Sequence, residues 1–137
     1  ELEMGRADAV AADIVSHLPA YLGGVYEKVA RETLMANVDS FFPFAAIGRW
    51  WDRNEEIDIV AVNSDHDSIL FCEVKATEKQ VGTDVLDALR EKAHKVKWGS
   101  AARKEYYCLF SRKGFTAGLL EQARKDGVVL FKEDHPL

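Results

Sequence analysis

Two short apolar runs separated by a polar loop constrain the fold of this chain more strongly than any other feature. The runs cover residues 56–62 and 69–75, and their β-branched and aromatic side chains are typical of strands. The residues between them, 63–68, are polar turn formers, so we expect an antiparallel hairpin. The whole chain has 137 residues, which is the size of one domain that can bury a substantial core.

Three charged side chains interrupt these apolar runs: Asp58 in the first, and Glu73 and Lys75 in the second. Burying charged groups costs free energy unless they are paired or serve a function. Because strand side chains alternate between faces, Glu73 and Lys75 share one face, and the hairpin can bring Asp58 alongside them. Such a group of side chains can hold a divalent metal ion and a water molecule beside a phosphodiester.

The same three residues also have a purely structural interpretation. Inward-facing charges on an edge strand oppose unwanted pairing with another chain. Under this interpretation Glu73 and Lys75 form an edge-strand pair, and Asp58 is solvated.

A third acid is available upstream of the hairpin. Glu27 lies in a predicted helix and shares a face with small and apolar residues, so it points either to solvent or toward the sheet. If it points toward the sheet, it joins Asp58 and Glu73 in a three-acid pocket for Mg²⁺ or Mn²⁺. We then expect Asp58 and Glu73 to be metal ligands, the carbonyl of Val74 to add a backbone ligand, and Lys75 to orient the attacking water.

Periodicity and capping residues predict further elements around the hairpin. Helices are expected over residues 5–17, from Pro19 to about Ala36, from the N-cap Thr83 to Trp98 with Gly99 as the stop, and from Thr116 to Gly127. Additional strands are expected over residues 45–52, 106–110 and 128–131. With the first two helices counted as one layer, the order α-β-β-β-α-β-α-β predicts an α/β fold. Its mixed sheet would be antiparallel in the first three strands and flanked by helices.

We therefore expect a single domain, with a helical N-terminal part over residues 5–36 and a core of sheet and helices over 44–133. The chain begins at Glu1 rather than Met, so we expect it to be excised from a longer chain. Cys72 and Cys108 lie in apolar runs, which favours buried free thiols in a reducing cytoplasm over a disulfide or a zinc site. No apolar stretch is long enough for a membrane span, so we expect no membrane association.

Charge is unevenly distributed along the chain. The net charge of −5 argues against tight non-specific binding of nucleic acid by the surface as a whole. Residues 92–113, however, carry seven Lys or Arg and one acid, a balance of +6 that leaves −11 for the rest of the chain. Two interpretations stay open: a basic stripe that meets phosphate, or cations that favour a helix C-terminus and the loop after it.

Three residues that flank the hairpin are candidate substrate contacts: Arg49, Lys79 and Gln80. Arg49 could hold phosphate or pair with Asp52 and Glu55, whereas Lys79 and Gln80 follow the second run closely enough to touch substrate. Of the adjacent Trp50 and Trp51, a strand turns one inward and one outward. The outward ring could stack on a base or pack against another module.

Glu27, Asp58 and the Glu73-x-Lys75 motif, in this order of elements, resemble the PD-(D/E)xK nuclease superfamily; Ile57 stands where that family has a proline before the metal-binding Asp. The resemblance implies a restriction-endonuclease-like αβββαβ core, here with an added αβ unit at the C-terminus. It also implies a Mg²⁺- or Mn²⁺-dependent hydrolase in which Glu27, Asp58, Glu73 and Lys75 are catalytic.

A narrower resemblance involves the motifs Gly-Arg-Trp-Trp at 48–51, Glu-Ile-Asp-Ile-Val-Ala at 56–61 and Glu-Val-Lys at 73–75. Over roughly residues 20–112 the chain looks like the C-terminal domain, of no settled function, of archaeal-type P-loop ATPases. No Walker motif occurs in this chain, which fits a fragment that carries only the trailing domain. This resemblance implies an N-terminal P-loop ATPase module as a partner.

Two functions follow from these resemblances. In the first, the domain is a metal-dependent endonuclease acting on DNA, with branched or single-stranded DNA as candidate substrates. In the second, it is a catalytically silent nuclease-fold domain that serves the ATPase as an interaction or regulatory module. Self-association into a homo-oligomer is compatible with either.

Overall fold

The computed structural model describes the backbone of residues 22–137 and the side chains from Tyr26 onward. The helix predicted over residues 5–17 and the predicted helix start at Pro19 lie outside the described residues. The helical elements are α2 (Leu22–Ala36), η2 (Val38–Ser40), η3 (Ser64–His66), α3 (Thr83–Ala93) and α4 (Ala117–Asp126). The strands are β1 (Ala46–Asp52), β2 (Glu55–Asn63), β3 (Ser68–Lys75), β4 (Lys104–Ser111), β5 (Val129–Lys132) and β6 (His135–Pro136). None of the described helices has both the length and the hydropathy needed to cross a bilayer.

All of these strands join one sheet in the order β1-β2-β3-β4-β5-β6. The pairs β1–β2 and β2–β3 are antiparallel, whereas β3–β4 and β4–β5 are parallel. The mixed sheet and the αβββαβ order with an added αβ unit confirm the predicted fold class; the short β6 was not predicted. The edge-strand interpretation of Glu73 and Lys75 is wrong, because β3 lies between two neighbours and Asp58 is only 9% exposed.

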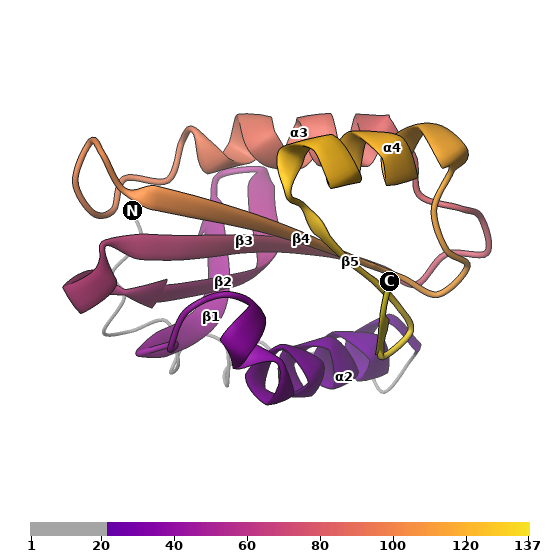
Figure 1. Cartoon of the computed structure of the whole chain (residues 1–137), viewed down its shortest axis with the longest axis horizontal. Helices are drawn as coiled ribbons and strands as arrows, with labels where there is room; N and C mark the ends of the chain where they lie inside the picture. Colours follow the sequence, from indigo (N-terminus) through magenta and orange to yellow (C-terminus); the bar gives the residue numbers. More distant parts are fainter. Residues whose placement is uncertain (1–21) are drawn as a thin grey trace.

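Helices cover both faces of the sheet, with α3 and α4 on one face and α2 on the other (Figure 1). The α3–α4 face packs on one cluster of buried side chains, among them Val60, Phe71 and Leu109. The α2 face packs on a second cluster that includes Ile59, Leu70 and Cys72. Alternate residues of β2 and β3 thus contribute to opposite cores, which explains why both strands read as continuous apolar runs.

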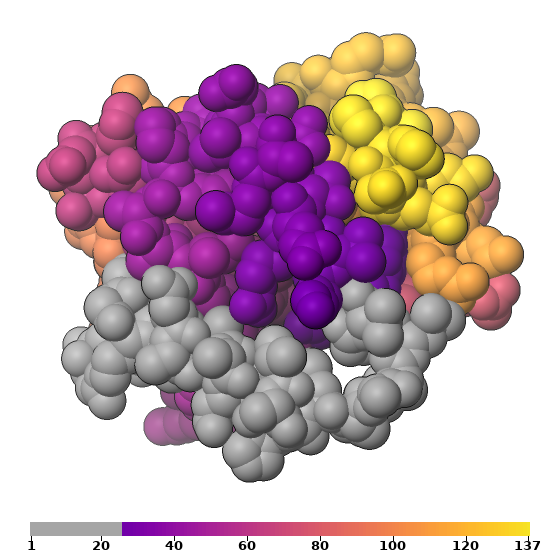
Figure 2. All heavy atoms as spheres, turned by 90° about the horizontal axis from the view of Figure 1, so that it is seen from below, coloured from indigo at the N-terminus to yellow at the C-terminus, as the bar shows by residue number. Residues whose placement is uncertain are grey.

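Helix α2 presents a narrow apolar stripe to the sheet. Tyr26, Ala30 and Leu34 are spaced four residues apart, so they lie on one side of the helix, and all three are buried. Figure 2 shows this face of the molecule, with the C-terminal segment beside α2. The Tyr26 hydroxyl donates to the carbonyl of Glu133 at 3.1 Å, which ties the helix to that segment.

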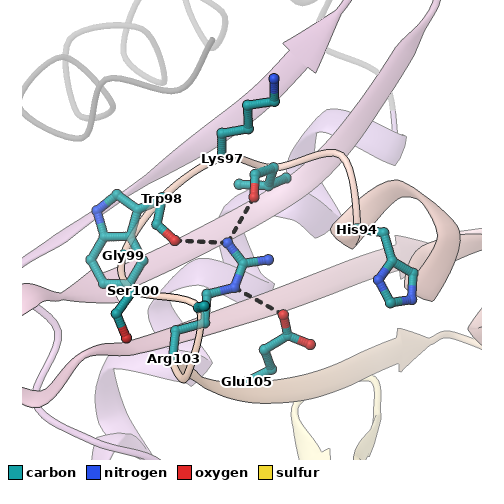
Figure 3. Close-up of a pocket in the computed structure, with 9 residues that line it drawn as sticks. His94, Lys97, Trp98, Gly99, Ser100, Arg103 and Glu105 are labelled. Carbon is teal, nitrogen blue, oxygen red and sulfur yellow. Dashed lines mark hydrogen bonds and ion pairs between the residues drawn. The ribbon is translucent and has the colours of Figure 1, made fainter.

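Helix α3 differs from the sequence prediction at both ends. Gly82 rather than Thr83 is the N-cap residue, and the helix ends at Ala93, five residues before Trp98. Arg103 accounts for the early end, because its guanidinium donates to the carbonyls of Val96 and Trp98 at 2.7 and 2.8 Å (Figure 3). It also donates to the carbonyl of Ala93 at 3.1 Å. Because Arg103 supplies donors for these carbonyls, they do not need the backbone N–H groups that a longer helix would provide.

Candidate active site

The candidate site begins at an irregularity in β2. Gly48 pairs with Val60 and Trp50 with Ile57, so two residues of β2, Asp58 and Ile59, lie opposite the single residue Arg49 of β1. This arrangement is a β-bulge, which bends a strand and redirects its side chains. Its effect is visible in the packing, since Ile57 and Val60 join the same core cluster although three positions apart.

The neighbouring strand parts from β2 at the same level. The last β2–β3 pair is Ile59 with Cys72, whereas β3 continues beside β4 as far as Lys75. The Val74 N–H is instead satisfied by the carboxylate of Asp58, with Oδ2 accepting it at 2.8 Å. Asp58 and Glu73 are therefore the first residues beyond the paired part of the hairpin. This agrees with the expectation that the hairpin brings the two residues close together.

Asp58 is an unusual carboxylate. Burial, and then repulsion by the neighbouring Glu73, raise its pKa from 3.8 to about 7, although the hydrogen bond from Val74 opposes this shift. The positive charge of Arg49 also opposes the shift, but more weakly than burial and Glu73 raise this pKa. The protonated form of Asp58 is therefore favoured mainly by burial, with the neighbouring Glu73 as the second cause.

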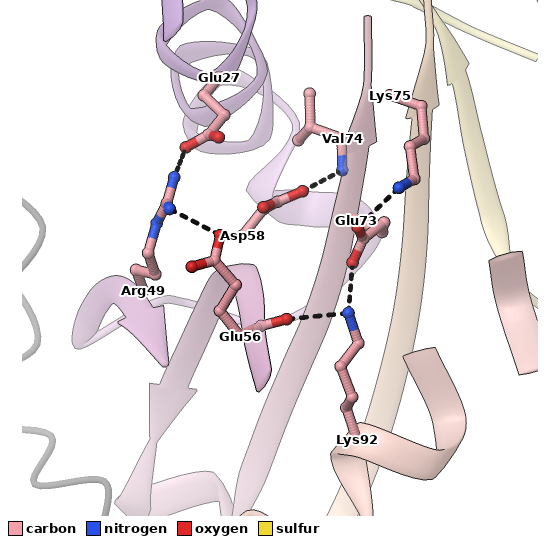
Figure 4. A network of polar contacts seen from close by, with 8 residues as sticks. All are labelled: Glu27, Arg49, Glu56, Asp58, Glu73, Val74, Lys75 and Lys92. Atoms are coloured by element: carbon pink, nitrogen blue, oxygen red, sulfur yellow. Dashed lines mark hydrogen bonds and ion pairs between the residues drawn. The ribbon is translucent and has the colours of Figure 1, made fainter. Parts of the chain in front are cut away.

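Glu73 contacts two ammonium groups. Lys92 of α3 approaches its Oε1 at 3.1 Å, and Lys75 approaches its Oε2 at 3.4 Å. The contact with Lys75 agrees with the prediction that the two residues share a face of β3. Lys92 also donates to the carbonyl of Glu56 at 2.8 Å, so it links β2 to β3 where the two strands have parted (Figure 4).

Glu27 points toward the sheet, but Arg49 lies between it and the other acids. The guanidinium of Arg49 is buried and pairs with Glu27, and with Oε1 of Glu56 at 3.0 Å. These partners differ from Asp52 and Glu55, which the sequence had offered as alternatives. Glu27 still contributes to the raised pKa of Asp58, after burial and Glu73, so it belongs to the same electrostatic environment (Figure 4).

The donor set fits a magnesium-type ion through two carboxylates rather than three. Mg²⁺ takes one or two carboxylates from a protein and keeps several waters, and Asp58 and Glu73 provide that number. Over residues 26–137 no group of three or more His, Cys, Asp or Glu is arranged to hold a metal. The raised pKa of Asp58 indicates that positive charge placed between the two acids would be stabilising.

Two participants in this network were missed by sequence reasoning. Lys92 and Glu56 connect the two strands; Lys92 belongs to no motif, and Glu56 begins the 56–61 motif without having been assigned a role. The available signal was the position of Lys92 three residues after the buried Leu89, at the border of the apolar stripe of α3. A lysine there can extend its stem along the core and carry its ammonium to the sheet.

The other predicted contact residues lie outside the network. Lys79 and Gln80 are exposed in the loop after β3. Trp50 is buried in the core and Trp51 is 46% exposed, as strand alternation predicted. Much of the basic segment 92–113 is paired locally: Lys95 with Glu55, Arg103 with Glu105, and Arg112 and Lys113 with Glu78.

A polar pocket lies beside the loop that follows α3. A pocket of about 550 Å³ is lined by the loop after the helix, including His94, Lys97, Trp98 and Ser100 (Figure 3). Arg103 forms part of its wall, but its guanidinium is occupied by backbone carbonyls and Glu105. The orientation of Arg103 is therefore explained by its bonds to Glu105 and to the carbonyls after α3, without a ligand.

The chain aligns with a curated protein and with a solved structure. A curated relative, an uncharacterized protein of Methanocaldococcus jannaschii, is 39% identical over 97 residues, which cover 68% of this chain and 22% of the relative. The chain thus spans about a fifth of the length of the curated relative that it matches. Among solved structures, a repair endonuclease from Pyrococcus abyssi aligns with a TM-score of 0.47 and 14% identity, over 81% of this chain and 47% of that one.

A family model provides the assignment. The model for DUF234, described as archaeal and bacterial proteins of unknown function, matches residues 1–103, about three quarters of the chain. The chain therefore belongs to the DUF234 family.

Proposed function

We propose that this domain binds Mg²⁺ or Mn²⁺ between Asp58 and Glu73 and hydrolyses DNA phosphodiesters. The observation that carries the proposal is the meeting of two buried carboxylates and the Lys75 ammonium where β2 and β3 part. Burial and mutual repulsion of the acids favour a cation between them. An irregular, charged point inside an otherwise apolar sheet costs stability, and such sites are commonly functional.

Each residue of the site would have a defined task. A bound divalent ion would neutralise charge on the phosphate and activate water. Asp58, fixed by the Val74 N–H, and Glu73 would hold the ion, with the Val74 carbonyl as a further oxygen donor. Lys75 is 38% exposed, so its ammonium can leave Glu73, orient the attacking water and stabilise the negative charge that develops on the phosphate.

The remaining predicted residues would act at the border of the site. Glu27 would serve as an accessory acid by holding Arg49 against the site, and Arg49 would contribute positive charge for the phosphate. The exposed Lys79 and Gln80 would contact the nucleic acid further along the strand end. The whole would be the C-terminal module of a longer chain that also carries a P-loop ATPase.

The test is nicking of branched, single-stranded and duplex DNA by the purified chain with Mn²⁺ or Mg²⁺, compared with EDTA. Lys75→Ala and Asp58→Asn should each reduce the rate by roughly 100-fold or more, because each removes a group that stabilises the transition state. Lys97→Ala, in the exposed loop after α3, is the matched control and should cleave at the wild-type rate. Equal rates for the wild type and Lys75→Ala would contradict the catalytic role.

A second candidate function is favoured by two specific observations. Arg49 neutralises Glu27, so only two acids face each other, and Trp51 exposes nearly half of its surface on the edge strand β1. Both fit a nuclease-like domain that binds a partner, such as the proposed ATPase module, without turnover. In that case Trp51→Ala should weaken capture of the module in a pull-down, and no DNA substrate should be cleaved.

A further inference from the structure

Lys92 holds a position that the proposed metal would also need. Its ammonium contacts Oε1 of Glu73 at 3.1 Å and the carbonyl of Glu56 at 2.8 Å. Because Glu56 belongs to β2 and Glu73 to β3, the ammonium bridges the two strands just beyond their last backbone pair. A divalent ion between Asp58 and Glu73 would bridge the same two strands at the same level.

The contacts of Glu73 show why a metal ion and the two lysines would compete for the same carboxylate. Its Oε1 faces Lys92 and its Oε2 faces Lys75 at 3.4 Å, so each carboxylate oxygen already has a cationic neighbour. Whichever oxygen a metal takes, one ammonium must give way or remain beside a doubly charged ion. Like charges a few ångströms apart in a buried site repel strongly.

Lys92 is the better candidate for the group that moves. Its ammonium also donates to the Glu56 carbonyl across the strand gap, so it occupies the position between the two strands that a bridging ion would take. Its ammonium is carried by a flexible four-carbon stem from the last turn of α3, so it can swing toward solvent without a change in backbone. Once displaced, the ammonium would lie at the rim of the site, where a phosphate group could accept it.

We propose that the Lys92 ammonium neutralises Glu73 in the metal-free protein, competes directly with the divalent ion, and is displaced when the ion binds. The inference rests on the proposed metal site between Asp58 and Glu73. It assigns Lys92 as a positioning residue that sets metal affinity, a role distinct from that of Lys75 in orienting water.

Titration with Mn²⁺ by calorimetry tests the competition without any activity measurement. Lys92→Gln should bind Mn²⁺ roughly 10-fold more tightly than the wild type, because one positive charge beside the ion is removed. Lys95→Gln carries the same charge change three residues along the chain, but Lys95 is 53% exposed and pairs with Glu55. It should bind Mn²⁺ with the wild-type affinity. A merely structural lysine would leave the affinity unchanged or weaken it.

A second measurement uses the unmodified protein and does not depend on how a variant folds. Acetylation of lysines, followed by mass spectrometry, should label Lys92 several-fold faster with Mg²⁺ than without it, and Lys95 equally in both conditions. Lys92 starts 18% exposed, so its release from Glu73 would be visible as a gain in reactivity.

The outcomes separate this inference from the function on which it rests. If Asp58→Asn abolishes Mn²⁺ binding while Lys92→Gln matches the wild type and Lys92 labelling ignores Mg²⁺, the competition is refuted and the metal site stands. If neither the wild type nor Lys92→Gln binds Mn²⁺, the proposed metal site fails and the competition fails with it.

Discussion

Asp58 is the residue whose environment has the clearest measurable consequence. Burial, followed by Glu73, holds its folded pKa near 7, whereas an unfolded chain leaves an Asp near 4. The folded protein therefore binds this proton more tightly than the unfolded one. The resulting stability is fully present below about pH 4 and is lost as the pH rises through about 7, with an upper limit of about 4 kcal/mol.

The loss of stability with rising pH leads to a prediction for the metal-free protein. Asp58→Asn keeps an oxygen acceptor for the Val74 N–H but cannot ionise, so it should gain stability over the wild type as the pH rises from 5 to 8. The gain should reach one to a few kcal/mol, on the order of 1 kcal/mol per pH unit. Urea unfolding in EDTA at several pH values measures it.

A suitable control is Asp65→Asn in the exposed η3 turn, which reports the effect of an Asp-to-Asn change away from the site. Stability curves of wild type and Asp58→Asn that run parallel from pH 5 to 8 would contradict the raised pKa. Added Mn²⁺ should reverse the order at pH 8, because the ion stabilises only the protein that binds it.

At the scale of elements, the sequence predicts the strands of the hairpin and both caps of α4, but not the C-terminal end of α3. The runs at 56–62 and 69–75 became β2 and β3 with one extra residue at most at each end, because β-branched residues bounded by turn formers leave few alternatives. The predicted end of α3 at Trp98 was wrong, because the helix end depends on a residue outside the helix. Arg103, ten residues beyond Ala93, donates hydrogen bonds to carbonyls that backbone N–H groups would satisfy in a longer helix.

Helix α4 offers a paired test of its predicted C-cap. Gly127 has φ of 72°, which an Ala adopts only with strain, whereas Gly118 lies inside the helix with open space where a Cβ would go. Gly127→Ala should cost about 1 kcal/mol of unfolding free energy, and Gly118→Ala should add about 0.5–1 kcal/mol. Opposite shifts in thermal midpoint would confirm both; a loss for Gly118→Ala would show that α4 is not ordered as described.

At the scale of the whole molecule, the sequence predicts the residues of the site better than their partners. Strand alternation sufficed for Glu73 and Lys75, because it depends only on spacing along β3. The pairing of Arg49 with Glu27 and the reach of Lys92 across the strand gap depend on how α2 and α3 lie over opposite faces of the sheet (Figure 4). That arrangement depends on the packing of both hydrophobic cores, which involves residues far apart in the sequence. A pattern within one short segment therefore cannot predict it.

The two cysteines report on the integrity of that packing. Cys72 and Cys108 are free, fully buried and adjacent on β3 and β4, and burial raises the pKa of the Cys72 thiol well above its usual range. A thiol reagent should therefore label them only when the sheet opens, at a rate that follows unfolding as urea is added. Rapid labelling of the native protein would mean that the β3–β4 pairing opens locally.

The bulge in β2 has a genetic consequence. Without Asp58, the order Ile57, Ile59, Val60 would restore strict alternation between the two apolar layers and remove the irregular pairing opposite Arg49. Deletion of Asp58 would thus remove a ligand of the proposed metal site and leave the neighbouring residues of β2 alternating between the two cores. The proposed site and the architecture of the sheet are therefore separable by the loss of a single residue.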